Sequence, residues 1–326
     1  MLSTPVIAAI KQLHPGASLW VMTTPLAADL LKEDPLVAGV IPFDKRGESR
    51  GVIGLMKLAY VLRALEFDVV YSLHRSLRTA ILLYLARIPI RIGFKEASCS
   101  FLYNQRVKRK QDGHEVLRNL SLLPIGVDQS PLEAYPLRLS CSERLPGELR
   151  LFLDSAKNNK FLVVVPGSAW RTKQWSADNY HQLCKVAVEQ GLTVCILGAV
   201  DEVNVCKSVA GELELVNLAG KTDLSSFLAV IRDAALVVCN DSFALHVAAA
   251  FKTPTVAVFC ATSPAFGFYP WQQRALVVEK QGLWCKPCRR HGSVKCPTGT
   301  ESCMKDLSWR EVWFNCVELL NRQTAS

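Results

Sequence analysis

The sequence predicts an α/β protein made of two Rossmann-like, doubly wound domains that face a cleft. Short apolar runs alternate with amphipathic helical patterns along most of the chain, as in parallel sheets covered by helices. Half of the 326 residues are hydrophobic, enough for two separate cores. A span rich in Pro, Glu and Ser divides the two patterns. We therefore expect a first domain over residues 1–135, a linker over 136–159 and a second domain over 160–326.

The first half predicts helices over residues 5–13, 25–32, 51–65, 76–86 and 114–123 and strands over 18–23, 37–43, 67–72 and 90–93. It opens on a helix with Pro5 in its first turn. A doubly wound domain should open on a strand that lies at the centre of its sheet. We therefore expect the chain as written to be a truncated form that lacks this strand.

The second half predicts strands over 161–165, 192–197, 214–217, 235–239 and 254–259 and helices beginning near Ser176, Asp201, Asp223 and Ser242. A final helix is expected over 308–321, after a cysteine-rich loop. The apolar strands predict a parallel sheet that is covered on both faces. Ligands of such sheets bind beyond the carboxyl ends of the strands, so the loops there are the first place to look for a site.

The formal net charge of +9 points to an anionic partner: a substrate, a membrane face or a nucleic acid. Cations gather at residues 75–78, 87–91 and 106–110, and aromatic residues are not interleaved with them. We therefore expect no nucleic-acid partner. No apolar run approaches the length of a membrane span, and we expect a cytoplasmic location.

The loop after the strand at 161–165 has the composition of a phosphate-binding loop. Ser168 and Thr172 offer hydroxyls, and Arg171 and Lys173 offer cations. Lys173 is the strongest candidate, because a compact cation there offsets the charge of a leaving diphosphate. The alternative is a solvated surface lysine.

A second candidate site follows the strand at 235–239, where Asp241 and Ser242 precede a helix that carries His246 one turn later. The free N–H groups of a helix start suit a phosphate. The plainer interpretation is an ordinary N-cap followed by a core histidine. Glu202, after another strand end, could accept a ribose hydroxyl or only complement a helix dipole.

Several motifs are absent. The sequence holds no D-x-D pair, which disfavours a metal-bridged diphosphate, and no Walker loop, G-x-G-x-x-G or G-x-S-x-G. Kinase, dehydrogenase and hydrolase functions are therefore disfavoured. Cys285, Cys288, Cys296 and Cys303 have the spacing C-x2-C-x7-C-x6-C, which fits a structural zinc site or else four reduced thiols in a surface loop.

With these residues assembled, the chain resembles glycosyltransferase family 9, the ADP-heptose:lipopolysaccharide heptosyltransferases, and most closely the heptosyltransferase II type. The resemblance rests on PGSAWRTKQW, LAGKTDLSSFLAVIRDAALVVCNDS, HVAAAFKTPTVAVF and the CKPC…CP…CM tail, with VIPFDKRG and SLHRSLRTA in the first half. It implies the GT-B arrangement, with the donor held mainly by the second domain.

The resemblance also implies roles for individual residues. The donor site would comprise Ser168 and Lys173 at the diphosphate, Glu202 at the ribose, Thr222 beside the adenine, and Asp241, Ser242 and His246 at the phosphates and the heptose. Lys173 and Asp241 would be the catalytic pair. The acidic acceptor would meet the first domain, where Arg75 and Arg78 are the candidate contacts.

Two departures from the family pattern matter. Phe243 stands where the family usually has Gly, at a close approach of backbone to phosphate. The family's opening strand and its Gly-Asp loop, which supplies the general base, have no counterpart in the chain as written.

We therefore expect an inverting, metal-independent heptosyltransferase of the lipopolysaccharide inner core. It would need no catalytic cofactor and would touch the anionic cytoplasmic face of the inner membrane transiently. Two alternatives stay open: a non-catalytic binder of sugar nucleotide or lipopolysaccharide, and a GT-B transferase that uses another sugar nucleotide.

Overall fold

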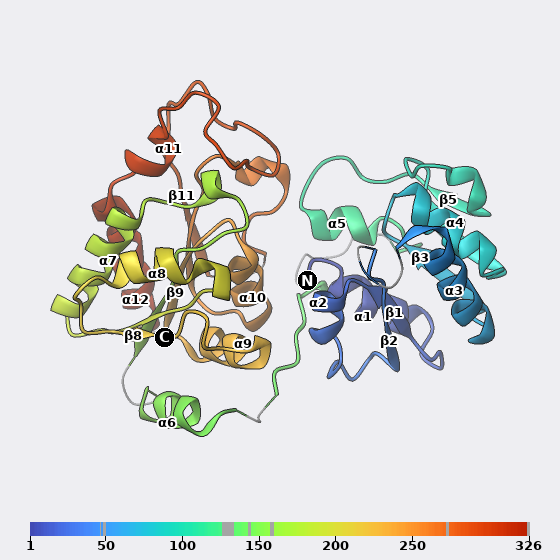
Figure 1. Ribbon diagram of the computed structural model, residues 1–326, viewed down its shortest axis with the longest axis horizontal. Helices are drawn as coiled ribbons and strands as arrows, with labels where there is room; N and C mark the ends of the chain where they lie inside the picture. Colours follow the sequence, from blue (N-terminus) through green and yellow to red (C-terminus); the bar gives the residue numbers. More distant parts are fainter. Residues whose placement is uncertain are drawn as a thin grey trace. The chain divides into compact units, whose positions relative to one another are not determined.

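The computed structural model describes residues 1–45, 47, 50–125, 134–142, 145–156, 160–271 and 274–324. The chain divides into two compact units, Met1–Tyr135 and Pro136–Ser326 (Figure 1). Both units are α/β, which confirms the predicted fold class. Each unit is described by itself below.

The predicted elements of the first unit all occur within a few residues of their expected bounds. Its order is α1 (Thr4–Leu13), β1 (Trp20–Thr23), α2 (Pro25–Asp29), β2 (Gly39–Pro42), α3 (Gly51–Ala64), β3 (Val69–Ser72), α4 (Leu77–Leu85), β4 (Ile90–Phe94), η1 (Ser100–Leu102), β5 (Gln105–Val107) and α5 (Glu115–Leu120). The short strand β5 was not predicted. Its three residues, Gln-Arg-Val, carry too little apolar character to stand out as a strand.

The parallel strands of the first unit form two separate sheets, β1-β2 and β3-β4-β5. Among the described residues no strand joins β1 to β3, so each has one unpaired edge. Most residues of β1 and β3 are correspondingly only half-buried. Unpaired N–H and C=O groups on these edges remain available to solvent or to another strand.

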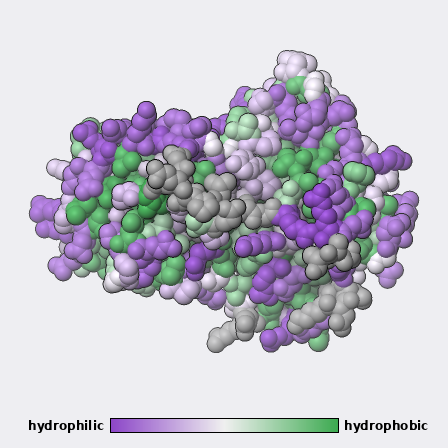
Figure 2. Space-filling model, turned by 180° about the vertical axis from the view of Figure 1, so that it is seen from behind, coloured by the Kyte–Doolittle hydropathy of each residue, from purple (hydrophilic) through white to green (hydrophobic). Residues whose placement is uncertain are grey.

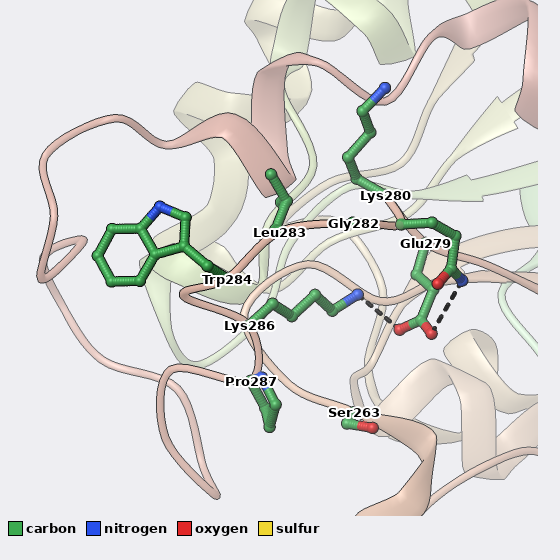
Figure 3. A pocket seen from close by; sticks show the side chains of 9 residues that line it. Ser263, Glu279, Lys280, Gly282, Leu283, Trp284, Lys286 and Pro287 are labelled. Atoms are coloured by element: carbon green, nitrogen blue, oxygen red, sulfur yellow. Dashed lines mark hydrogen bonds and ion pairs between the residues drawn. The ribbon is translucent and has the colours of Figure 1, made fainter.

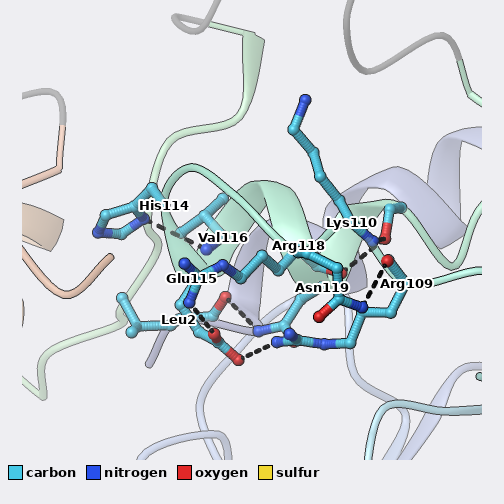
Figure 4. Close-up of polar contacts among 10 residues, drawn as sticks. Leu2, Arg109, Lys110, His114, Glu115, Val116, Arg118 and Asn119 are labelled. Atoms are coloured by element: carbon cyan, nitrogen blue, oxygen red, sulfur yellow. Dashed lines mark hydrogen bonds and ion pairs between the residues drawn. The ribbon is translucent and has the colours of Figure 1, made fainter. Parts of the chain in front are cut away.

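Helix α5 is tied to the rest of the first unit by buried charges (Figure 4). The Glu115 carboxylate pairs with Arg109 at 2.6 Å and with Arg118 at 3.5 Å, and Asn119 donates to the carbonyl of Leu2 at 3.3 Å. Both arginines are buried. Arg109 belongs to the cationic group at 106–110, so part of that group holds the fold together and is not available to a ligand.

Arg91, in the cationic group at 87–91, has the same kind of internal role. Its guanidinium donates to the carbonyl of Leu102 at 2.9 Å and to that of Ile88. The sequence pattern alone does not distinguish such an arginine from one that faces a ligand.

The second unit is larger and follows its predicted order closely. Its elements are α6 (Gly147–Ala156), β6 (Phe161–Val165), η3 (Arg171–Lys173), α7 (Ala177–Glu189), β7 (Thr193–Ile196), η4 (Val200–Glu202), α8 (Val203–Ala210), β8 (Val216–Asn217), α9 (Leu224–Asp233), β9 (Leu236–Asn240), α10 (Phe243–Phe251), β10 (Thr255–Val258), η5 (Pro264–Phe266), β11 (Ala275–Val278), α11 (Ser302–Lys305) and α12 (Trp309–Thr324). Strand β11 and the short helix α11 were not predicted.

The six strands of the second unit form one parallel sheet in the order β11-β10-β9-β6-β7-β8. Numbered from β6, this is the order of dinucleotide-binding folds, 3-2-1-4-5-6. The chain reverses direction across the sheet between β6 and β9. The loops after these two strands therefore lie on either side of the place, here called the crevice, where folds of this strand order hold their ligands.

Helices lie on both faces of this sheet, which explains the apolar character of its central strands (Figure 1). Every residue of β6, β9 and β10 is buried. Helices α7 and α9 begin where the sequence places their caps: Ser176 accepts from the N–H of Asn179, and Asp223 from that of Ser226.

The predicted linker is not a plain coil, because α6 lies within it and contacts α9. Residues 143–144 and 157–159 of that linker lie outside the described residues. Figure 2 shows hydrophobic side chains as separate patches among hydrophilic ones on the face that it draws. None of the described helices is both long enough and apolar enough to cross a membrane.

Candidate functional site

Asn240 at the end of β9 joins the two loops that flank the crevice. Its side chain is fully buried. Its amide donates to the carbonyls of Pro166 at 2.8 Å and Gly167 at 3.2 Å. Its oxygen accepts from the Trp175 N–H at 3.0 Å and from the Tyr180 hydroxyl at 3.1 Å. One side chain therefore fixes both ends of the loop that carries Ser168 and Lys173.

Lys173 and Asp241 meet across the crevice. The Lys173 ammonium lies 2.7 Å from an oxygen of the Asp241 carboxylate, and the Thr262 hydroxyl donates to the same oxygen at 2.7 Å. The Ser168 hydroxyl approaches the Asp241 carbonyl at 3.5 Å. Asp241 is therefore not an N-cap of α10, and Lys173 is not a solvated surface lysine.

The start of α10 offers donors to an anion. Ser242 precedes its first residue, and the Ser242 hydroxyl is buried with no hydrogen-bond partner among the described residues. The first N–H groups of a helix have no acceptor within that helix. His246 lies one turn into α10 and is half-buried. Phe243 turns toward α9, where its ring stacks on Phe227 with centroids 5.9 Å apart.

Glu202 lies directly over Gly167. A Cβ atom at Gly167 would come within 2.1 Å of the Glu202 carboxyl group, so a larger residue there would displace this side chain. The carboxylate accepts from the Ala199 N–H at 2.9 Å. Burial raises the pKa of Glu202 above its ordinary value, and this hydrogen bond partly opposes the shift. Thr222 precedes the cap of α9 on the far side of β7, at the same edge of the sheet.

The loop that contains the four cysteines packs against the Lys173 loop. Thr172 is buried, and its hydroxyl both donates to the Ser293 carbonyl at 3.0 Å and accepts from the Ser293 N–H at 2.8 Å. Gly292, at a φ of +79°, lies so close that a Cβ there would touch the side chains of Lys173 and Trp170 at 3.1 Å. The cysteine-containing loop therefore restricts the position of Lys173 through contacts with Thr172 and with the Lys173 side chain.

The structure does not assemble the zinc site expected at Cys285, Cys288, Cys296 and Cys303. Within the described part of the chain, no group of three or more His, Cys, Asp or Glu side chains could hold a metal ion. All four thiols are free, and a hydrogen bond with Thr298 helps lower the pKa of Cys296 to about 7. Burial first, then the neighbouring thiols of this group, raises the pKa of Cys288 and of Cys303, so the four thiols lie near one another.

In the first unit, four basic side chains follow the ends of β2 and β3. The Lys45 ammonium lies 3.4 Å from both ring nitrogens of His74, and the Arg78 guanidinium lies 5.8 Å from the centre of the Phe43 ring. Burial first, then nearby cations, lowers the pKa of Lys45 and of His74. Arg75 and Arg78 therefore belong to one basic cluster. Arg75 is exposed to solvent, whereas the guanidinium of Arg78 is held by the Gly51 carbonyl at 3.1 Å.

A pocket of about 320 Å³ lies beside the end of β11 (Figure 3). Its lining includes Ser263, Glu279 and Lys286. The Lys286 ammonium is tied to the Glu279 carboxylate and to the Phe259 carbonyl, both at 2.6 Å. Lys286 therefore connects β10 and β11 and is a structural cation.

Sequence analysis missed the roles of three residues that shape the donor-side geometry. Asn240 lay in a quoted motif without an assigned role, and Thr262 was not singled out at all. Thr172 was expected to offer its hydroxyl to a phosphate, but that hydroxyl is instead paired with Ser293. A buried amide directly after an apolar strand was the available signal for Asn240. Nothing local identifies the partner of Thr172 or of Thr262, because these partners are far away along the chain.

Comparison with known proteins identifies the relatives of this chain. A family model described as glycosyltransferase family 9 (heptosyltransferase) matches residues 55–297. The lipooligosaccharide heptosyltransferase 2 of Haemophilus ducreyi is 25% identical over 288 residues, which cover 82% of each chain.

Two solved structures are similar over nearly the whole chain and share its fold. A glycosyltransferase family 9 protein of Veillonella parvula has a TM-score of 0.85 at 20% identity, covering 98% of this chain and 93% of its own. The ADP-heptose lipopolysaccharide heptosyltransferase II of Escherichia coli has a TM-score of 0.76 at 23% identity, covering 99% of this chain and 95% of its own.

Proposed function

Because this chain belongs to glycosyltransferase family 9, the heptosyltransferases, we propose that it transfers heptose from ADP-heptose to the inner core of lipopolysaccharide. The transfer would invert the anomeric carbon and would use no metal ion. The observation that carries the proposal is the Lys173–Asp241 pair at the crevice, beside the unpartnered hydroxyl of Ser242. The donor is also named in the description of the Escherichia coli relative.

The chemical step is a displacement at the anomeric carbon of the heptose. An acceptor hydroxyl forms the new C–O bond while the bond from that carbon to the diphosphate oxygen breaks. Lys173 and the N–H groups at the start of α10 stabilise the charge on the departing ADP. The proton of the acceptor hydroxyl passes to a general base, a role that we assign to none of the described residues.

The remaining donor contacts follow from the order of the strands. Glu202, at the end of β7, would accept a ribose hydroxyl, and Thr222, after β8, would lie beside the adenine. Ser168 would meet the diphosphate, with Ser242 and His246 at the phosphates and the heptose. Asp241 would hold Lys173 in place and bind the sugar.

The basic cluster of the first unit suits an acidic acceptor. Burial first, then the charge of Arg78, lowers the pKa of Lys45, and burial first, then the charges of Lys45 and Arg75, lowers the pKa of His74. A bound phosphate or carboxylate would therefore offset the repulsion within the cluster. Arg75 is the exposed member and the most direct candidate contact. We propose that these side chains receive the acidic core saccharide, on the cytoplasmic face of the inner membrane.

The test is a transfer assay with purified protein, a set of lipopolysaccharide acceptors that either lack heptose or already carry core heptose, and a panel of ADP- and UDP-sugars. We expect the acceptor to gain the mass of one heptose only with ADP-heptose. Transfer from a UDP-sugar would support the alternative GT-B transferase. Tight ADP binding without turnover on any acceptor would support the non-catalytic binder.

A chelator arm tests metal independence. We expect EDTA to leave the initial rate unchanged, because a lysine and a helix start take the place of a metal at the diphosphate. Elemental analysis of protein purified under reducing conditions decides whether the four cysteines carry zinc in solution.

A further inference from the structure

The segment from Lys280 to Thr300, here called the basic loop, has an unusual charge pattern. It contains Lys280, Lys286, Arg289, Arg290 and Lys295 and no acidic residue. Lys286 is used internally, as described above. Arg289, Arg290 and Lys295 are exposed, and none of them makes an ion pair within the described part of the chain. Three unneutralised cations therefore lie within seven residues.

Apolar side chains stand among these cations. The Trp284 side chain is 88% exposed and that of Val294 is 67% exposed. Figure 3 shows the Trp284 indole extending away from the Lys286–Glu279 pair. A large apolar side chain left so exposed loses the free energy of burial unless a partner covers it.

The basic loop is held firmly, so its exposed side chains have a defined place. Cys288 donates its N–H to the Ala261 carbonyl at 3.0 Å, and Ser293 is locked to Thr172 as described above. In Figure 1 the segment between β11 and α11 projects from the second unit, beyond the ends of the strands. It can meet a flat surface without rearranging the sheet.

From this combination we propose that the basic loop docks the enzyme on an anionic phospholipid bilayer, with Arg289, Arg290 and Lys295 at the headgroups and Trp284 and Val294 in the interface. Tryptophan favours the boundary between headgroups and acyl chains. Cations near an anionic bilayer are attracted by its surface potential. This inference rests on the proposed function, in which the acceptor lies on a membrane, and it names the segment that would contact that membrane.

A nucleic acid would also attract the cations, but the observations favour a bilayer. Moving an exposed valine from water into the membrane interface is favourable, because its apolar surface is buried. A valine side chain can neither stack on a nucleic-acid base nor form hydrogen bonds with one. The loop also carries one aromatic side chain rather than the series on which successive bases stack. Binding to DNA is therefore an outcome that the test must exclude.

The test is vesicle co-flotation of the full chain with phosphatidylcholine alone or with 30% phosphatidylglycerol, alongside a single-stranded DNA. We expect binding to the anionic vesicles that weakens with salt. Each exposed cation near the bilayer is worth about fivefold in affinity. The variant R289Q/R290Q/K295Q should therefore bind these vesicles on the order of a hundredfold more weakly.

The matched control is K160Q/K185Q/K207Q, which removes the same charge from exposed lysines of the second unit. We expect this control to bind vesicles nearly as well as the parent. A second readout is tryptophan emission, which should shift to shorter wavelength on anionic vesicles in the parent and much less in W284F.

The proposal is overturned if the two triple variants bind vesicles equally, if the parent does not bind anionic vesicles, or if DNA competes fully with them. ADP binding and the thermal midpoint should be unchanged in both triple variants, which shows that they are folded. Loop-dependent vesicle binding without heptose transfer would refute the proposed function and leave this inference standing.

Discussion

Lys173 is the residue on which the proposed chemistry depends most. Its ammonium already contacts Asp241 at 2.7 Å, and this partner keeps it in the crevice before any donor arrives. A bound diphosphate would add negative charge at the same place. In the proposed reaction the lysine would therefore combine this contact with a role that grows as the leaving group departs.

We expect K173A to lower kcat/KM by about thirtyfold to a thousandfold, because losing one such contact costs on the order of 2–4 kcal/mol in the transition state. Steady-state kinetics with ADP-heptose measure this loss. K32A is the control, since Lys32 forms only an exposed ion pair with Asp29. A K173A enzyme with near-parental kcat/KM would contradict the assigned role.

Glu202 gives a prediction about pH. Burial raises its pKa in the folded protein, so the native state binds a proton more readily than the unfolded chain. Its stabilising contribution is complete below its unfolded pKa and is lost as pH rises through the folded pKa. E202Q does not titrate, so its stability relative to the parent should increase from about pH 4 to pH 7.

Urea unfolding of both proteins at several pH values measures the difference in their free energies of unfolding. A difference that is constant across pH would contradict the raised pKa of Glu202. ADP binding supplies a second readout. The amide is a weaker acceptor for a ribose hydroxyl than a carboxylate, so we expect E202Q to bind ADP about tenfold more weakly.

At the level of secondary-structure elements, hydrogen bonds from β9 and from the segment before α11 hold the loop that follows β6. The loop that follows β6 carries Lys173, and its backbone is held by Asn240 from β9 and by Ser293 from the segment before α11. Neither contact involves the reacting groups directly. Both restrict the place where the lysine can be.

T172V tests this positioning, because valine keeps the shape of threonine and removes the hydroxyl that pairs with Ser293. We expect a loss of about 1–3 kcal/mol in unfolding free energy, since the Ser293 N–H loses its acceptor. We also expect kcat/KM to fall by about tenfold as Lys173 loses its support.

The matched control is T253V, which removes another buried threonine hydroxyl, the one that donates to the Ile231 carbonyl at 2.9 Å. It should lose a similar stability and keep its kcat/KM. Equal kinetic losses in T172V and T253V would mean that the effect follows stability and not position.

At the level of the whole chain, the two units differ in the size of their sheets. The second has a six-stranded sheet with a continuous core, whereas the first has two short sheets with half-exposed strands. The donor-side residues from Ser168 to His246 all lie in the second unit. The proposed division of labour assigns the donor to this unit.

We therefore expect a fragment of residues 136–326 to fold by itself and to bind ADP with an affinity close to that of the full chain. Circular dichroism during thermal unfolding and titration calorimetry measure these two properties. The same fragment carrying K173A should fold and bind ADP more weakly. A folded fragment with no affinity for ADP would place the nucleotide elsewhere.

Much of the fold was predictable because its signals are local. Five apolar residues at 161–165 predict a buried strand, and Ser176 and Asp223 predict the starts of α7 and α9, since caps act within one turn. Short or weakly patterned elements such as β5 and α11 were not predicted, because three or four residues carry too little periodicity to indicate a strand or a helix. The helix α6 escaped because its Pro- and Glu-rich surroundings resemble a linker.

Sequence patterns alone were enough to predict the two α/β halves, the family resemblance and the list of candidate donor residues. The tertiary structure alone decided which of them meet: Lys173 with Asp241, Glu202 over Gly167, and Thr172 with Ser293, which is 121 positions away. It also showed that Arg109 serves the fold. The physical reason is that caps and periodicity act over a few residues, whereas these contacts depend on the order in which distant strands pair in the sheet.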